Sequence, residues 1–201
     1  LRGLVELNLR DTEITGLGLA HLFGLENLSG LNLHGTPVTD VGLAYVGGME
    51  SLVRLLLAGT EVSDAGLMRL KRLSRLSYLH LGGTSVTDVG LAHLETLQGL
   101  NNLNLYGTSV TDAGLVHLAK LKGLNYLSLS STGVTDMGLR HLAALPELTG
   151  LWLSNTGVTD AGLVHLKESG SIKLLDLYET AVTDAGEDLL KSAQAGLQVS
   201  R

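Results

Sequence analysis

Threonine recurs every 24 residues along this chain, and this fixed period constrains the fold more than any other feature. The eight copies keep one register without a slip, at Thr12, Thr36, Thr60, Thr84, Thr108, Thr132, Thr156 and Thr180. Three aliphatic positions precede each threonine, as Leu100, Leu103 and Leu105 precede Thr108. A period of about 20 to 29 residues with this leucine spacing indicates stacked structural units, rather than a compact globular enzyme.

By length alone, the 201 residues could form one domain or two. The unbroken period predicts a single repeat domain over residues 1–201. Within it, we expect residues 1–3 to be the tail of a preceding repeat, residues 4–186 to form the repeats and residues 187–201 to form a C-terminal cap. We expect no membrane span, because no stretch approaches the ~18 consecutive apolar residues that one needs.

The charge balance argues against nucleic acid as a partner. The net charge is −6, whereas phosphate binding needs clustered Lys and Arg. The one basic cluster is Arg69, Lys71, Arg72 and Arg75, which we interpret as the solvated face of a helical turn. The chain has no cysteine, which excludes disulfides and thiolate metal sites but leaves the cellular compartment open.

One repeat, residues 100–123, predicts the local structure of all of them. A short strand is expected over residues 102–104, with Leu103 pointing inward and Asn102 and Asn104 pointing outward, because side chains alternate on a strand. A turn follows at Tyr106, before Thr108. We expect the threonine hydroxyls to form an internal column that satisfies backbone groups of the neighbouring coil.

A short helix is expected to follow in each repeat. Thr111 is a suitable N-cap, and Asp112 in the first turn favours the positive end of the helix dipole. Leu115 and Leu118 have the spacing of one helix face. Gly114 has an equivalent in every copy, although glycine within a helix costs about 1 kcal/mol relative to alanine. We expect close approach of adjacent coils at this position.

These repeats resemble the leucine-rich repeat superfamily, and closely match its cysteine-containing, ribonuclease-inhibitor-like branch, with threonine in place of the cysteine. Similar threonine-bearing repeats look common in bacterial proteins of this type. The resemblance covers essentially the whole chain. It implies an α/β solenoid shaped as a horseshoe, with eight 24-residue repeats, a parallel sheet on the concave face and short helices on the convex face. Members mostly bind proteins or peptides, so it also implies such a partner.

The two ends of the array depart from the pattern. Repeat one has Gly16 where later repeats have aspartate, and the last repeat has Glu187 where the others have an inward leucine. A polar break of this kind is expected of a terminal cap. The N-terminal end carries no such device, so we expect an apolar edge there that could support self-association.

Aromatic residues concentrate at the outward strand positions, which form three columns. Five of the six Tyr and Trp residues fall there, and only Tyr45 lies elsewhere. Tyr126 and Trp152 are expected to be diagonal neighbours, since adjacent strands lie ~4.8 Å apart. Because Tyr and Trp often anchor interfaces, we predict a binding surface for a protein or peptide on the concave face. Its predicted residues are Tyr78, His80, Asn102, Asn104, Tyr106, Tyr126, Trp152, Asp176 and Tyr178.

Three alternatives to this binding surface stay open. Open strand positions tolerate aromatic residues, which favour β structure in any case. The array could instead be a structural scaffold or spacer within a larger multidomain protein. Aromatic residues combined with Asn and Asp can also hold sugars, which would make the chain a carbohydrate-binding module.

We predict no enzyme activity, no cofactor and no metal site. Histidine recurs at His21, His93, His117, His141 and His165, but each lacks the partner at i+4 that a helical zinc pair needs. The repeated aspartates lack a second carboxylate in each turn, whereas calcium needs six to eight oxygen ligands. His80 and Asp176 are four strands apart, ~19 Å, which is too far for a catalytic dyad.

Overall fold

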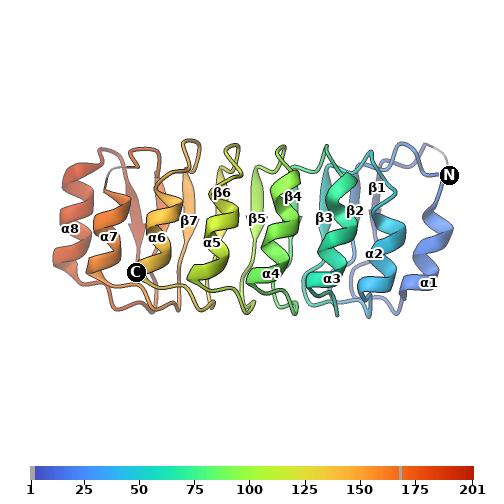
Figure 1. The fold of residues 1–201 in the computed structure, drawn as a ribbon, viewed down its shortest axis with the longest axis horizontal. Coiled ribbons are helices and arrows are strands. Elements are labelled where there is room, and N and C mark those ends of the chain that lie inside the picture. Colours follow the sequence, from blue (N-terminus) through green and yellow to red (C-terminus); the bar gives the residue numbers. More distant parts are fainter. Residues whose placement is uncertain (1–2, 168) are drawn as a thin grey trace.

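The protein is a curved solenoid of two layers in a computed structural model that describes residues 3–167 and 169–201 (Figure 1). In these residues, nine parallel strands form one sheet in sequence order. The strands are β1 (Glu6–Asn8), β2 (Gly30–Asn32), β3 (Arg54–Leu56), β4 (Tyr78–His80), β5 (Asn102–Asn104), β6 (Tyr126–Ser128), β7 (Gly150–Trp152), β8 (Leu174–Asp176) and β9 (Gln198–Ser200). The first eight confirm the expected strand positions, including residues 102–104.

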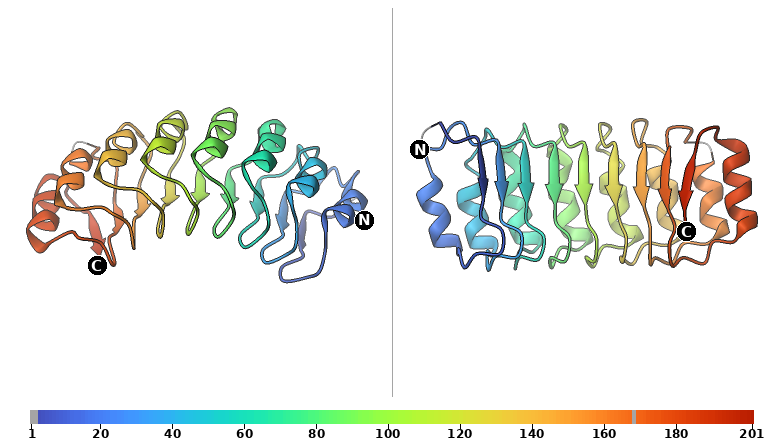
Figure 2. Two further views of the ribbon diagram at one scale, coloured as in Figure 1. Left: turned by 60° about the horizontal axis from the view of Figure 1, so that its bottom comes forward. Right: turned by 180° about the vertical axis from the view of Figure 1, so that it is seen from behind.

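One helix follows each of the first eight strands. The helices are α1 (Gly16–Leu19), α2 (Asp40–Val46), α3 (Asp64–Leu67), α4 (Asp88–Leu91), α5 (Asp112–Leu118), α6 (Asp136–Leu142), α7 (Asp160–Leu166) and α8 (Asp184–Ala193). Three of them continue as 3₁₀ turns, at Ala20–Leu22, Met68–Arg72 and Ala92–Thr96. The sheet lines the inner side of the arc and the helices cover the outer side, as the resemblance implied (Figure 2).

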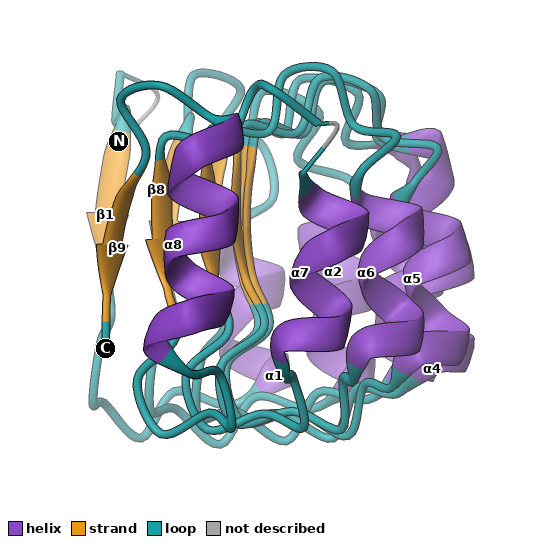
Figure 3. Ribbon diagram, turned by 90° about the vertical axis from the view of Figure 1, so that its left-hand side faces the viewer, coloured by secondary structure: helices purple, strands orange, loops and turns teal. Residues whose placement is uncertain are grey.

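The 24-residue period fixes the register of the sheet. Each strand residue pairs with the residue 24 positions later, so that Leu79 pairs with Leu103 and Leu103 with Leu127. The inward leucines therefore form continuous rows through the stack. Leu79 and Leu127 have no exposed surface, and Leu103 is 2% exposed. Figure 3 shows the sheet and the helices as two layers seen from one end. The core lies between them and consists of leucines and valines, with Met49 and Ile172.

The repeated aspartates connect adjacent coils, a role that the sequence did not reveal. Asp112 accepts the Thr135 backbone N–H at 2.8 Å through Oδ1 and the Thr135 hydroxyl at 2.6 Å through Oδ2. The same two bonds recur between consecutive coils, and we call these aspartates the aspartate ladder: Asp40, Asp64, Asp88, Asp112, Asp136 and Asp160. The ladder aspartates also occupy the first helical turn, as expected.

In six of the eight copies, from Gly66 to Gly186, the recurring glycine is needed because of this ladder. A Cβ on Gly114 would lie 2.4 Å from Oδ1 of Asp88 and 2.9 Å from Cδ1 of Leu91, both in the preceding coil. Atoms cannot approach so closely, so only glycine leaves room for the aspartate between the coils. The close approach predicted from the sequence is thus present, and its cause is the aspartate.

The threonine column differs from its prediction in one respect. Thr108 donates its hydroxyl proton to the Leu105 carbonyl at 2.7 Å, within its own coil, and not to the neighbouring coil as expected. The hydroxyl is three residues from that carbonyl and closes the turn after the strand. The column is buried at Thr36, Thr60, Thr84 and Thr108, and more exposed toward both ends. The Leu105 carbonyl also accepts the Thr108 backbone N–H at 3.2 Å, so the hydroxyl is its second donor and finds its own partner within the coil.

The two ends of the array are built differently. Residues 187–201, expected as a cap, include most of α8 and the strand β9, which keeps the 24-residue register because Leu174 pairs with Gln198. There Arg201 pairs with Asp184 and Glu187, which takes the place of contacts to a further coil. At the other end, Leu7 and Leu9 are partly exposed, whereas their equivalents Leu31 and Leu33 have no exposed surface, so an apolar edge is present as predicted.

Candidate concave-face binding site

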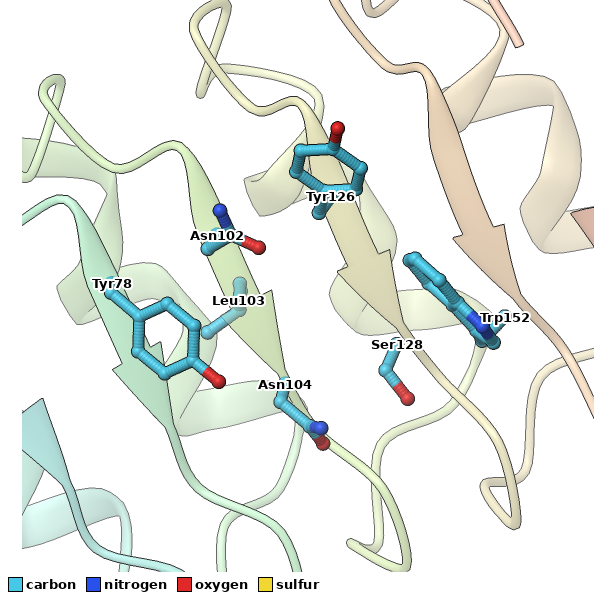
Figure 4. Close-up of a pocket in the computed structure, with 7 residues that line it drawn as sticks. All are labelled: Tyr78, Asn102, Leu103, Asn104, Tyr126, Ser128 and Trp152. Carbon is cyan, nitrogen blue, oxygen red and sulfur yellow. The ribbon is translucent and has the colours of Figure 1, made fainter. Parts of the chain in front are cut away.

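Five of the nine predicted binding residues surround one depression on the concave face. Tyr78, Asn102, Asn104, Tyr126 and Trp152 line it, from strands β4 to β7 (Figure 4). Two further residues, Leu103 and Ser128, complete the lining, and the hollow has a volume of about 260 Å³. Because outward side chains of neighbouring strands lie side by side, a regular sheet is sufficient to bring these residues together.

Tyr126 and Trp152 form an aromatic pair at one side of the depression. Their ring centroids are 6.2 Å apart and the ring planes are tilted by 38°. This distance is typical of interacting aromatic rings, and it confirms that the two residues are diagonal neighbours. Trp152 remains partly exposed, so its ring is accessible to a partner.

Gly150 makes room for this aromatic pair. It lies on β7 next to Tyr126 on β6, in the first outward column. A Cβ at this position would lie 2.6 Å from Cδ1 of Tyr126 and 2.8 Å from Cη2 of Trp152. The indole ring can therefore fold along its own strand only because residue 150 has no side chain.

The other four predicted residues lie outside the depression. His80 is on β4, and Tyr106 follows β5; Asp176 and Tyr178 lie at and beyond the end of β8. Tyr106 and Tyr178 are exposed. Three strands separate His80 from Asp176 in the sheet, which agrees with the expectation that they do not form a dyad.

Several of the predicted polar residues also stabilise the end of their own strand. Asn104 accepts the Tyr106 N–H at 2.9 Å, and Asp176 accepts the Tyr178 N–H at 3.3 Å. Nδ1 of His80 accepts the Gly82 N–H at 3.1 Å. Each of these side chains therefore uses one acceptor atom within the chain. In Asn104, the amide nitrogen remains available to contact a ligand.

Burial lowers the pKa of His80 below its ordinary value of 6.5, and the nearby His34 lowers it further. The hydrogen bond from the Gly82 N–H is consistent with a neutral ring, because Nδ1 can accept a hydrogen bond only when it carries no proton. His80 is thus neutral at pH 7. The centre of the concave face is correspondingly free of positive charge from this residue.

Each charged group that flanks the depression already has a partner within the chain, although the partners of Asp176 are neutral hydroxyls. On the N-terminal side, Glu6 and Arg54 form an ion pair of 2.8 Å across Gly30. On the C-terminal side, Asp176 accepts the hydroxyls of Ser154 and Ser200. Within the described part of the chain, no charged side chain lines the depression itself.

The repeated histidines lie on the convex side, away from this site. Nδ1 of His117 contacts Oε1 of Glu95 at 2.6 Å, and Lys120 contacts the same oxygen at 2.7 Å. Hydrogen bonds from Lys120 and His117 hold the pKa of Glu95 below its ordinary value. In residues 3–167 and 169–201, no group of three or more His, Asp and Glu side chains could hold a metal ion.

Sequence reasoning missed Ser128, Leu103 and Gly150 as parts of the site. Ser128 lies in an outward column and could have been included by strand alternation alone. Leu103 was assigned to the interior, where its side chain lies, but it also contributes to the floor of the depression. Gly150 has no side chain to suggest a role, so only its surroundings in the fold reveal it.

Comparison with known proteins supports the fold. No protein-family model and no curated protein matches the chain. Among solved structures, it is similar to internalin C2 of Listeria monocytogenes, with 26% sequence identity and a TM-score of 0.81. The match covers 98% of this chain and 80% of the internalin chain.

That neighbour is a leucine-rich repeat protein, so the likeness supports a protein-interaction repeat module. Across the described residues, no helix is both long and apolar enough to cross a membrane. The 24-residue period, the single parallel sheet with helices on its outer side and this structural likeness show that the chain folds as a leucine-rich repeat solenoid.

Proposed function

We propose that the chain is a binding module that recognises a protein or peptide on its concave face, through residues of strands β4 to β8. The observation that carries this proposal is the depression between Tyr78 and Trp152, in which three aromatic rings and two amides converge. Tyr and Trp are enriched at the residues that dominate interface energies. Solenoids also offer extended concave surfaces for such contacts.

The outer residues of the predicted surface would extend the contact beyond the depression. Tyr106 and Tyr178 are exposed on the same face and could cover a partner at its rim, together with His80 and Asp176. Rim contacts usually contribute less than a desolvated centre. We therefore expect Trp152 to matter most, and we expect the module to have no catalytic role.

The test uses a displayed library of random peptides, selected against the purified chain. Selected peptides are then titrated against wild type, Trp152→Ala and Val164→Ala. Val164 belongs to the same repeat as Trp152 but is exposed on α7, on the opposite face. Trp152→Ala should weaken binding by at least ~2 kcal/mol, about thirtyfold, and Val164→Ala should leave it unchanged. Equal affinity for wild type and Trp152→Ala would remove the depression from the interface.

A scaffold function is the second candidate, because of the apolar N-terminal edge. On the first coil, Phe23 is 80% and Val5 51% exposed, and the leucines that the interior coils bury are partly exposed, at Leu4, Leu7 and Leu9. Single scattered apolar residues are common on surfaces, whereas a cluster at one end favours contact with another copy or domain. Sedimentation of wild type and Phe23→Ser at increasing concentration tests this: association that the substitution abolishes would support a scaffold role.

A further inference from the structure

We propose that the depression receives one uncharged side chain, apolar or aromatic, from a partner protein, and that Gly150 gives the depression the shape that admits it. This inference rests on the proposed function and specifies the chemistry of the partner. The candidate anchor is a side chain such as leucine or phenylalanine, presented on an otherwise flexible segment or a surface loop. The argument has three parts: charge, shape and hydrogen bonding.

The charge of the depression favours an uncharged anchor. Its lining consists of Tyr, Asn, Leu, Ser and Trp, and the nearest flanking charges, Glu6 with Arg54 and Asp176 with its hydroxyl partners, are already satisfied. A charged group that leaves water needs a counter-charge at the site. Among the residues that line the depression, a carboxylate or an ammonium group would find none.

A lysine or arginine could still be held by the aromatic rings alone. Such contacts stabilise a cation by about 0.5–2 kcal/mol at most sites, which is less than the cost of removing an ammonium from water without a carboxylate. Part of the Trp152 ring is also occupied by its contact with Tyr126. The depression is therefore better suited to a neutral side chain.

The shape of the depression depends on Gly150. The Trp152 ring lies so close to Cα of residue 150 that a single methyl group would overlap with it and with Tyr126. The backbone of Gly150 is not in the left-handed region, so alanine is compatible with the strand itself. Gly150→Ala should therefore move the two rings and leave the fold intact, which makes Gly150 a positioning residue.

Free hydrogen-bonding groups surround the apolar part of the depression. Among the described residues, the hydroxyls of Tyr78, Tyr126 and Ser128 and the indole N–H of Trp152 have no hydrogen-bond partner within the chain. They can bond the backbone N–H and C=O groups on either side of an inserted side chain. A sugar would need bonds to most of its hydroxyls. However, the Asn102 amide nitrogen already donates to Asn101, and the Asn104 amide oxygen already accepts the Tyr106 N–H. These observations favour a peptide segment over a carbohydrate.

The experiment uses Trp152 as its own reporter. It is the only tryptophan in the chain, so tryptophan emission reports on the depression alone. The probes are five blocked peptides of the form acetyl-Gly-Gly-X-Gly-Gly-amide, with Leu, Phe, Lys, Glu or Gly at X, and methyl β-D-glucoside, all at millimolar concentration. We expect a saturable change in emission with Leu and Phe at X, and none with Lys, Glu, Gly or the sugar. A saturable change in emission with the Lys peptide, the Glu peptide or the sugar would overturn the proposal. The absence of a change with both the Leu and the Phe peptide would also overturn it.

A matched pair of variants tests the role of Gly150. Gly150→Ala should weaken binding of the Leu and Phe probes by at least about fivefold, the effect of disturbing a hot spot. Gly30→Ala is the control, because it lies in the same column and the three atoms nearest to its added methyl all belong to the Glu6 carboxylate. It should bind the probes like wild type. Equal binding by Gly150→Ala and wild type would refute the positioning role.

The library selection separates failure of this inference from failure of the proposed function. If selected peptides depend on Trp152 but share a charged residue, the binding face is correct and the uncharged anchor is wrong. If no selected peptide depends on Trp152, the proposed function itself is wrong. Both the proposed function and this inference would be supported if the selected peptides share an uncharged residue, depend on Trp152 and bind the Gly150→Ala variant more weakly than wild type.

Discussion

The first coil and the coils in the middle of the array share one leucine pattern, yet they are buried to different extents. Leu7, on β1, remains partly exposed, whereas its equivalents Leu31 and Leu55 have no exposed surface. Thr12 is exposed and Thr36 is buried. The difference shows that the core of one coil is covered by its neighbours, so stability is the sum of contacts between adjacent coils.

The joint between the first two coils also lacks the aspartate. Gly16 occupies that position, and a Cβ there would lie 2.8 Å from Cα of Gly42 in the next coil. The first joint is thus closed by direct contact between glycines, while the interior joints contain a carboxylate. The same repeat unit therefore forms two kinds of joint with its neighbour.

The largest expected effect is the difference in stability loss between a leucine of the interior row and its equivalent at the N-terminal edge. Leu103→Ala should destabilise the chain by roughly 2–5 kcal/mol, because it leaves a cavity in a fully covered row. Leu7→Ala should cost clearly less, since one side of Leu7 already faces solvent. Urea unfolding followed by circular dichroism measures both. A loss below about 1 kcal/mol for Leu103→Ala would contradict the buried row.

The next effect concerns the aspartate ladder. Asp112→Ala should destabilise by about 1.5–3 kcal/mol, because it removes two bonds to an anionic acceptor and leaves the Thr135 N–H without a partner. Asp184→Ala is the control: its side chain is 88% exposed and faces Arg201 instead of a further coil. That change should cost less than about 1 kcal/mol. Similar losses in both variants would show that the ladder does not connect the coils.

A smaller effect is expected in the threonine column. Thr108 and Thr12 make the same bond, at 2.7 Å, to the carbonyl three residues earlier, but only Thr108 is buried. Thr108→Val should therefore cost about 1 kcal/mol, because the buried Leu105 carbonyl loses the hydroxyl and keeps only the backbone N–H of residue 108 as a donor. In Thr12→Val, water can replace the hydroxyl, and we expect little change. The melting temperatures of the two variants and of wild type, measured under the same conditions, test this difference.

The smallest expected effect is a pH dependence of stability that comes from His80 on the concave face. The folded pKa of His80 lies below 6.5, so the unfolded chain takes up the proton first as the pH falls. The stability contributed by neutral His80 is complete above pH 6.5 and decreases below it. NMR titration of the His80 ring should give a pKa below 6.5, and His34→Ala should raise it only in part, since burial is the larger cause. A pKa at or above 6.5 would contradict this picture.

Much of the fold follows from the sequence because the period is so regular. Leucines at fixed spacing determine the inward face, and strand alternation places Asn102 and Asn104 on the outward face, as found. A period of 24 residues also determines which residues lie side by side on neighbouring strands. The juxtaposition of Tyr126 and Trp152 is a direct consequence of this register.

The parts that the sequence did not determine depend on contacts between particular atoms. The aspartate was read as a residue of its own helix, but its carboxylate bonds the next coil, and this is visible only once the coils are stacked. Four of the nine predicted binding residues lie outside the depression, because a column position fixes the face of a residue but not the direction of its side chain.

The sequence by itself determined the repeat, the parallel sheet and the concave location of the aromatic residues, since these depend only on periodicity and on the alternation of side chains. The tertiary structure decided how the coils are joined and where the depression lies. Both depend on distances of a few ångströms between side chains of different coils, such as the space that Gly150 leaves for Trp152.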